Sequence, residues 1–440
     1  MPPFRNAIFR MPGLYTSRAS RARYFFWLGR GLGLEGVRRH ALFGSSPEAF
    51  YYRDMAFILG IESSCDETSA AVVRDGEELL SNVVLSQILT HQAYGGVVPE
   101  LASREHLRAM VPVVRQAVEQ SGIAMENIDA LAVTKGPGLA GALLVGLSYA
   151  KALAFALEKP LISINHLEGH IHAVLLEARQ NNSGQLAGGS PSGLEFPVLA
   201  LVVSGGHTHL YLAEQVESVW RYQNVGHTRD DAAGEAFDKV AKLLALGYPG
   251  GPMIDALAKY GDAMAVNFPA AQLKHRDRKD RGPAPDRPHF DFSFSGIKTA
   301  VLRYVETENM APSIALRRSV LAQLANPGVE DIRKRSDRRT LDLLASFQRG
   351  VVQDLVGKTL AAAREYQAAT LLVSGGVAAN SELRQVFERT AARNGLRVLF
   401  PSRRLSTDNA AMIAAAAYPK WQARNFASDD LTIEASLPLR

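Results

Sequence analysis

The feature that most constrains the fold is a short pattern that occurs twice: an apolar strand, a small polar turn and a second strand. The first copy reads "FILGIE", "SSCDET" and "SAAVV" from Phe57, and the second reads "PVLALVV", "SGGHT" and "HLYLAE" from Pro197. Unbroken runs of Ile, Leu and Val are typical of strands buried on both faces. A third such strand meets another glycine turn in "ATLLVSGGVAAN", residues 369–380.

The segments between these strands alternate between helical and strand patterns. Residues 100–122 have helical spacing and end at a glycine, and residues 139–158 are apolar almost all round, which predicts a buried helix. Alternating elements predict an α/β protein, and the repeat predicts two similar halves. We expect a first subdomain at 55–175, a flexible insertion at 176–196 containing the Gly/Ser-rich stretch 178–195, and a second subdomain at 197–440 with a helical insertion at about 230–340.

Positive charge is concentrated at the N-terminus. Residues 1–54 contain nine arginines and three acidic residues, whereas the rest of the chain holds 40 basic and 41 acidic residues. Overall charge is therefore no evidence for a nucleic-acid partner, and only the basic stretches 274–287 and 330–340 could contact phosphates, with solvated loops as the alternative. Residues 1–54 are either upstream sequence before a start at Met55, which we favour and which predicts a cytoplasmic protein, or a transit peptide, which predicts the mitochondrial matrix.

Several classes are excluded by what the sequence lacks. Cys65 is the only cysteine, so an intramolecular disulfide and a cysteine-rich metal site are impossible, and a reducing compartment is indicated. No unbroken apolar run reaches the roughly 18 residues of a membrane span, so we expect no membrane insertion. The segment "TKGPGLAG" has its lysine before the glycines, which disfavours a P-loop NTPase.

The segment "NHLEGH" places His166 and His170 one helical turn apart. At this spacing both rings project from one helix face and can bind one metal ion, while satisfied polar or packing roles are the alternative. Zinc proteases use H-E-x-x-H, with the glutamate directly after the first histidine. Glu168 follows His166 by two residues, about 200° around the helix, so it points away from the histidines and is badly placed as a protease base.

Glycine turns after predicted strands favour a nucleotide ligand, because their exposed backbone N–H groups can bind phosphate. Such turns occur at 204–206, 249–251 and 374–376. Asp238 lies on a predicted helix and is either a solvated acidic residue or a ligand for a ribose hydroxyl. Asp408 precedes an Ala-rich helix, so it is either an N-cap or a third ligand beside the two histidines.

Eight segments together resemble one family. They occur in the order "GIESSCDET", "NHLEGH", "LVVSGGHTHL", "DDAAGEAFDKVAKLL", "YPGGP", "FSFSGIKTAV", "VSGGVAAN" and "STDNAAMIA". From about Phe57 to the C-terminus the chain looks like the TsaD family of tRNA N6-adenosine threonylcarbamoyltransferases. The resemblance implies an α/β fold of the actin, hexokinase and heat-shock chaperone (ASKHA) type, with two related ribonuclease-H-like subdomains around a nucleotide cleft.

The resemblance also implies the residues of the site. His166, His170 and Asp408 would bind one divalent metal ion, for which two histidines and a carboxylate suit Fe(II), with Zn(II) as a second possibility. The donor would be L-threonylcarbamoyladenylate, and the residues that would contact it are Val202, Val203, Ser204, Gly205, Gly206, Asp238, Gly251, Asp255 and Asn380.

The activity that the resemblance implies is that of an N6-L-threonylcarbamoyladenine synthase, an acyl-type transferase that acts on tRNA and releases AMP. Asp66 and Glu67 would be candidates for the group that accepts the proton of the attacking amine, with turn hydrogen bonding as their alternative role. Because the core is nearly neutral, we expect tRNA binding to involve partner proteins, which in bacteria would be TsaB-like and TsaE-like.

Two other functions compete with the transferase. A sugar or acetate kinase of the same superfamily would leave the histidine pair unexplained. A non-catalytic scaffold should have lost the metal triad, whereas His166, His170 and Asp408 are all present.

Overall fold

The computed structural model describes residues 55–182, 194–216, 219–268, 290–324 and 327–440. The N-terminal extension, the basic stretch 274–287 and most of the insertion at 176–196 lie outside the described residues. Two five-stranded sheets form the framework, in the orders β3-β2-β1-β4-β5 and β10-β9-β6-β7-β8. The strands are β1 (Phe57–Glu62), β2 (Glu67–Arg74), β3 (Glu78–Ser86), β4 (Ala130–Gly136), β5 (Leu161–Asn165), β6 (Val198–Val203), β7 (Thr208–Val216), β8 (Val219–His227), β9 (Thr370–Ser374) and β10 (Arg397–Leu399).

The two sheets repeat one topology. In the first sheet β1 is antiparallel to β2, β2 is antiparallel to β3, and β4 runs parallel to both β1 and β5. In the second sheet β6, β7, β8, β9 and β10 repeat the same order and the same directions. The prediction of two related α/β halves is confirmed.

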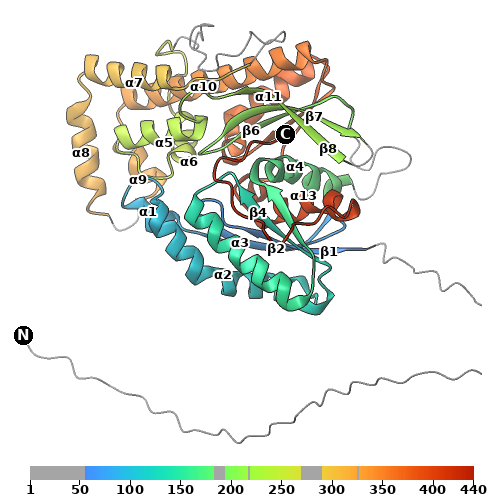
Figure 1. Ribbon diagram of the computed structural model, residues 1–440. Helices are drawn as coiled ribbons and strands as arrows, with labels where there is room; N and C mark the ends of the chain where they lie inside the picture. Colours follow the sequence, from blue (N-terminus) through green and yellow to red (C-terminus); the bar gives the residue numbers. More distant parts are fainter. Residues whose placement is uncertain (1–54, 183–193, 217–218, 269–289, 325–326) are drawn as a thin grey trace, which may run out of the picture. The chain divides into compact units, whose positions relative to one another are not determined.

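The helices cover both faces of both sheets (Figure 1). Apart from short 3₁₀ turns, of which η3 (Gly376–Ala379) follows β9, they are α1 (Ile88–Gln92), α2 (Pro99–Ser121), α3 (Ala140–Leu157), α4 (His166–Asn182), α5 (Ala233–Leu243), α6 (Gly250–Ala258), α7 (Ser295–Thr307), α8 (Ala311–Leu321), α9 (Val329–Arg333), α10 (Arg338–Glu365), α11 (Ser381–Arg393), α12 (Arg403–Ser406) and α13 (Ala410–Gln422). The helices between β8 and α10 occupy the region of the predicted helical insertion.

Helices α4 and α13 pack against each other in the layer between the two sheets (Figure 1). The alanine-rich α13 covers one face of the first sheet, where it packs on Ile58, Ala71 and Ile162. A Cβ atom on Gly60 would lie 2.4 Å from the carbonyl oxygen of Ala410. Only glycine therefore permits this close approach of helix to strand. The inner face of the second sheet packs on α4 through Leu167, Ile171 and other apolar side chains.

Two boundaries differ from the sequence expectation. Helix α4 continues to Asn182, so the segment expected to be flexible begins as helix. The C-terminal helix α13, placed with the second subdomain by its position in the sequence, packs on β1, β2 and β4 of the first sheet. Because this helix returns to the first half, residues from both ends of the described chain meet beside α4.

Helix α3 also differs from expectation. It packs on α2 and β4, but one of its faces is exposed, with Leu144 55% and Phe155 88% accessible. By length and composition alone its 18 residues would be sufficient to cross a membrane, although 33% of them are buried in the fold. The expectation of no membrane insertion was based on unbroken apolar runs. Helix α3 is apolar enough on average although it contains one lysine and two glycines.

Candidate metal centre and nucleotide site

The start of α4 and the start of α13 bring three potential metal ligands together. His166 is the first residue of α4, directly after β5, and His170 lies one turn later on the same face. Asp408 lies just before α13, and the three residues each offer a ligand atom within 4.8 Å of the others. The N-cap of α13 is Asn409, whose side chain accepts a hydrogen bond from the N–H of Met412, so Asp408 is not needed as a cap.

The geometry of the triad fits a metal ion. The Nε2 atoms of His166 and His170 lie 3.6 Å and 3.1 Å from Oδ1 of Asp408. His170 is fully buried, and its Nδ1 has no hydrogen-bond partner among the described residues. Nε2 of each histidine approaches the same oxygen of Asp408, as ligand atoms of one ion would. Two imidazole nitrogens and one carboxylate are a donor set that suits Fe(II) or Zn(II).

The charged groups around the triad shift one another's pKa values. Burial alone would lower the pKa of His166, but the carboxylates of Asp408 and Glu62 outweigh burial and raise its pKa to about 9. Burial opposes ionisation of Asp408, but the nearby His166 and His170 hold its pKa well below the usual range of an aspartate. The two carboxylates therefore favour positive charge at this point, which is where a divalent cation would be stabilised.

Asp66 is the last residue of the turn between β1 and β2 and Glu67 is the first residue of β2, close to the triad. Asp66 is buried, and Glu67 accepts a hydrogen bond from the hydroxyl of Ser86. Burial, followed by repulsion from Asp66 and Asp408, raises the pKa of Glu67 well above that of an ordinary glutamate. Burial and the same acidic neighbours raise the pKa of the Cys65 thiol, which disfavours a thiolate nucleophile.

The turn after β6 lies beside the metal centre. The rings of His166 and His207 are 5.9 Å apart between centroids, and His207 directly follows Gly206. Val202 and Val203 are fully buried in the core, so only their backbone can face a ligand. A Cβ atom on Gly205, Gly206 or Gly251 would meet nothing within 4 Å. These glycines therefore border open space of the kind that a close-lying ligand needs.

The remaining residues predicted to bind the donor already have partners at helix N-termini. Asp238 on α5 accepts the N–H of Gly250 at 2.7 Å, at the start of α6. Asp255 on α6 accepts the N–H and the hydroxyl of Ser381, and Asn380 is the N-cap of α11. The structure thus brings α5 to the start of α6 and α6 to the start of α11, with the carboxylates also serving to hold these helices.

Sequence reasoning missed three residues of this region. Glu62 contacts His166, His207 contacts the same ring, and Tyr248 lies near Asp66 and Asp238, which together with burial raise its pKa. All three lie inside quoted motifs, since Glu62 belongs to "GIESSCDET", His207 to "LVVSGGHTHL" and Tyr248 to "YPGGP". Membership of these motifs was therefore the available signal.

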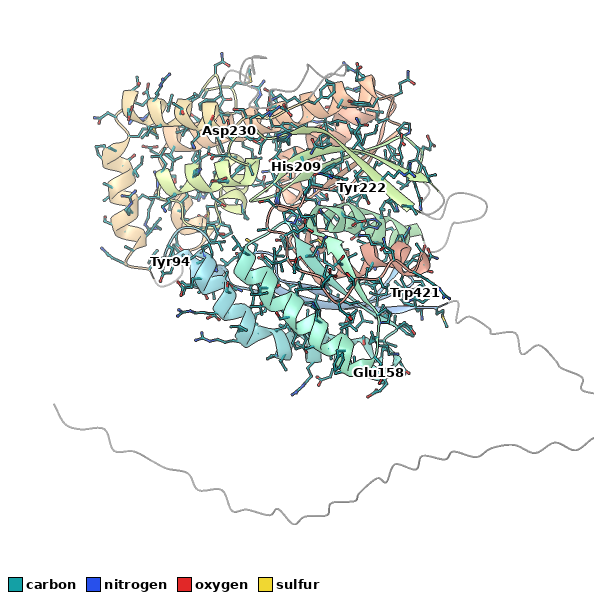
Figure 2. The ribbon with its side chains drawn as sticks, in the orientation of Figure 1. Tyr94, Glu158, His209, Tyr222, Asp230 and Trp421 are labelled. Carbon is teal, nitrogen blue, oxygen red and sulfur yellow. The ribbon has the colours of Figure 1, made fainter. Side chains whose placement is uncertain are left out.

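A row of aromatic and imidazole rings continues from His207 along the second sheet. The rings of His207 and His209 are 5.8 Å apart, and His209 stacks on Tyr211 and on His227. Figure 2 shows His209 and Tyr222 on the neighbouring strands β7 and β8. Burial and the neighbouring His227 lower the pKa of His209 to about 4, so the His209 ring is neutral near neutral pH.

The other predicted features have structural roles. Glu168 pairs with Lys420 at 2.7 Å on the side of α4 away from the histidines, as the helical spacing predicted. A cavity of about 490 Å³ lies on that same side, lined by Glu168, Lys420 and the C-terminal residues. In the basic stretch 330–340, arginines pair with acidic side chains of the same region or of its neighbours, as in Arg333 with Glu330 and Arg338 with Asp342. This pairing favours the alternative of a solvated surface segment.

Known proteins similar to this chain point to one activity. The model of the family TsaD, described as tRNA N6-adenosine threonylcarbamoyltransferase, matches residues 78–415. A protein of that name from Koribacter versatilis is 66% identical over 386 residues, which cover 88% of this chain and 99% of the relative. Another from Syntrophotalea carbinolica is 48% identical over 383 residues, which cover 87% of this chain and 96% of that protein.

Similarity among solved structures is more distant. Full-length HypF in its phosphate- and nucleotide-bound form aligns with a TM-score of 0.47 and 12% identity, over 84% of this chain and 46% of that chain. The family match covers more than half of the chain, and the two relatives match nearly their whole length. With the triad and the glycine turns in place, the chain belongs to the TsaD family of tRNA N6-adenosine threonylcarbamoyltransferases.

Proposed function

We propose that this enzyme transfers the threonylcarbamoyl group from L-threonylcarbamoyladenylate to N6 of the adenosine 3′ of the anticodon, in tRNAs that read codons beginning with A, with release of AMP. The observation that carries the proposal is the convergence of His166, His170 and Asp408 beside the glycine turn that follows β6. A metal centre next to a phosphate-binding turn suits a substrate that joins a phosphate to a carbonyl group.

The donor would be held by backbone groups around the second sheet. Asp238 on α5 meets the start of α6, and Asp255 on α6 meets the start of α11. The starts of helices carry partial positive charge, which favours the adenylate phosphate. The open space at Gly205, Gly206 and Gly251 supports a close approach of the nucleotide to the backbone.

We propose Fe(II) as the ion held by His166, His170 and Asp408, with Zn(II) as the alternative. When bound, such an ion supplies Lewis-acid stabilisation of oxygens that become more negative during transfer. The buried imidazoles exclude water on one side and keep the ligand atoms fixed.

The attacking amine needs a base, because the exocyclic N6 of adenine is a weak nucleophile. In the proposed step N6 bonds to the carbamoyl carbon, the bond to the phosphate oxygen breaks, AMP leaves, and one N6 proton passes to a carboxylate. Glu67 is the favoured acceptor, since its raised pKa makes its ionised form a stronger base than an ordinary glutamate. Asp66, buried beside it, is the second candidate.

We propose that the enzyme binds tRNA together with a TsaB-like and a TsaE-like protein. Paired arginines in the stretch 330–340 leave little free positive charge there, which supports a need for partners. Exposed apolar side chains on two adjacent helices support a contact surface for the TsaB-like protein: Leu107 and Val111 on α2, and Leu144 and Phe155 on α3.

A reconstituted assay tests the proposed function. Unmodified tRNA, threonine, bicarbonate, ATP, the adenylate-forming enzyme and both partner proteins would be combined with wild type, His166→Ala or the exposed control Glu126→Gln, and modified nucleosides read by mass spectrometry. We expect threonylcarbamoyladenosine from wild type and control only. A chain beginning at Met55 should be equally active if, as we propose, the enzyme is cytoplasmic. Product from His166→Ala at the wild-type rate would contradict the proposal.

A further inference from the structure

A carboxylate behind the metal ligands is left without a role by the proposed reaction. Glu62 is the last residue of β1 and is fully buried. Side chains alternate between the faces of a strand, so Glu62 shares a face with Ile58 and Gly60, the face covered by α13. Its side chain therefore enters the layer between the two sheets, where the triad lies.

Both oxygens of Glu62 are fully engaged. Oε1 accepts the N–H of Ser64, while Oε2 accepts the hydroxyl of Thr134 at 2.6 Å and lies 3.1 Å from Nδ1 of His166. Thr134 lies on β4, and His166 directly follows β5. The ends of three neighbouring strands thus supply the carboxylate and two of its partners. A buried carboxylate with this many donors is held as an anion.

An anion beside Nδ1 determines which ring nitrogen of His166 can bind a metal. Glu62 can only accept a hydrogen bond, so Nδ1 carries the proton and donates. In the neutral imidazole, the form that can bind a metal ion, Nε2 then keeps its lone pair, and Nε2 is the atom on the side of Asp408, 3.6 Å from its Oδ1. The hydroxyl of Ser64, 3.2 Å from the same Nδ1, adds a second contact on the proton side.

The second histidine has no such support. Nδ1 of His170 has no hydrogen-bond partner in the part of the chain that the structure describes, and its Nε2 lies 3.1 Å from Oδ1 of Asp408. The two imidazoles therefore differ at Nδ1: that of His166 meets a buried carboxylate, and that of His170 meets no polar partner.

We propose that Glu62 is a positioning residue of the metal centre, which fixes His166 in the tautomer with Nε2 free and so strengthens metal binding. This inference rests on metal binding at the triad, as proposed above. Carboxylate or carbonyl partners of metal-bound histidines commonly contribute about 10–100-fold to metal affinity. Glu62 does not touch the donor in this proposal, and its role is separate from that of Asp66 and Glu67.

The test measures Zn(II) affinity by competition with a chromogenic chelator, using the full chain without substrates. We expect Glu62→Gln to weaken Zn(II) binding about 10–100-fold. Thr134→Val is the matched control, because it removes a hydrogen bond to the same carboxylate but leaves the contact with His166. It should lower thermal stability and change Zn(II) affinity less than about threefold. A purely structural role of Glu62 would instead give both variants similar effects on Zn(II) affinity.

A second measurement uses the wild type alone, so it does not depend on the folding of a variant. Nitrogen-15 NMR of the zinc-loaded wild type should show the proton of His166 on Nδ1 and the metal on Nε2. Metal on Nδ1, or unchanged Zn(II) affinity in folded Glu62→Gln, would overturn the inference. Failure of the wild type to bind Zn(II) or Fe(II) at all would instead overturn the proposed metal centre, so the two failures are distinguishable.

Discussion

At the scale of single residues, the ionised side chains of the site stabilise one another. Asp408 ionises readily because two histidines face it, and His166 gains a proton because two carboxylates face it. Glu62 and Asp408 lie on opposite sides of the His166 ring, one at Nδ1 and the other at Nε2. The ring thus lies between the two carboxylates. Substitution of either carboxylate should therefore change the affinity for the metal ion.

Replacement of Asp408 by Asn tests the carboxylate ligand. The side chain keeps its shape but loses its charge, so affinity for a divalent ion should fall at least about tenfold, which is about 1.4 kcal/mol. Chelator competition with Zn(II) measures the change, and Glu126→Gln on the surface serves as control. Wild-type affinity in folded Asp408→Asn would exclude this residue as a ligand.

Glu67 should determine the acid limb of the reaction rate. Because transfer requires the ionised carboxylate and burial raises its pKa, the rate should begin to fall at a higher pH than an ordinary glutamate would give. Glu67→Gln should lower kcat by about 10²–10⁴-fold and leave Zn(II) affinity unchanged. If Asp66→Asn, but not Glu67→Gln, shows this loss, the base is Asp66.

At the scale of elements, the site is made where strands end and helices begin. The turn after β9 approaches β6 so closely that a Cβ atom on Gly375 would lie 2.3 Å from the carbonyl oxygen of Val203. Gly375 also has a φ of +92°, a conformation that other residues adopt at a cost. Helix α5 packs against the turn after β6, since the N–H of Gly234 donates to the carbonyl of Ser204. Three elements therefore pack closely together beside the predicted nucleotide site.

Gly375→Ala should destabilise this close packing. The required φ alone should cost about 1–3 kcal/mol of unfolding free energy, and the close contact with Val203 should add to that loss. Urea denaturation measures the difference. The neighbouring Gly376→Ala is the control, because its Cβ would meet nothing within 4 Å, and it should retain wild-type stability. Equal stabilities of the two variants would show that the turn is not as constrained as described.

At the scale of the whole molecule, stability should depend on pH through buried histidines. Burial lowers the pKa of His172 to about 3, and burial with His227 lowers that of His209 to about 4. The unfolded chain takes up these protons near the ordinary histidine pKa of about 6.5. The contribution of these two histidines to the unfolding free energy should therefore be constant above about pH 6.5 and fall as pH drops toward 4. His209→Gln should show a shallower fall in urea titrations between about pH 7 and 4, and an identical slope would contradict this origin.

Partner binding is a second property of the molecule as a whole. A charge in the exposed apolar surface of α2 and α3 should weaken association, so Leu107→Asp should reduce co-purification with a TsaB-like protein by at least about tenfold. Leu107 is 68% exposed, so stability should be unchanged. Leu316→Asp on α8, where the wild-type leucine is 66% exposed, is the matched control. Equal effects of both substitutions would place the contact elsewhere.

The sequence by itself determined the repeated α/β halves, the histidine pair on one helix face and the glycine turns, because periodicity and turn chemistry are local. Only the tertiary structure decided which residues meet. Asp408 reaches the histidines because α13 packs against α4, and Glu62 reaches His166 because three parallel strand ends are neighbours. Asp238 and Asp255 proved to hold helix starts, which spacing alone does not reveal. Contacts between distant segments depend on how the two sheets and their shared helices pack, and that packing has no signature in any one stretch of sequence.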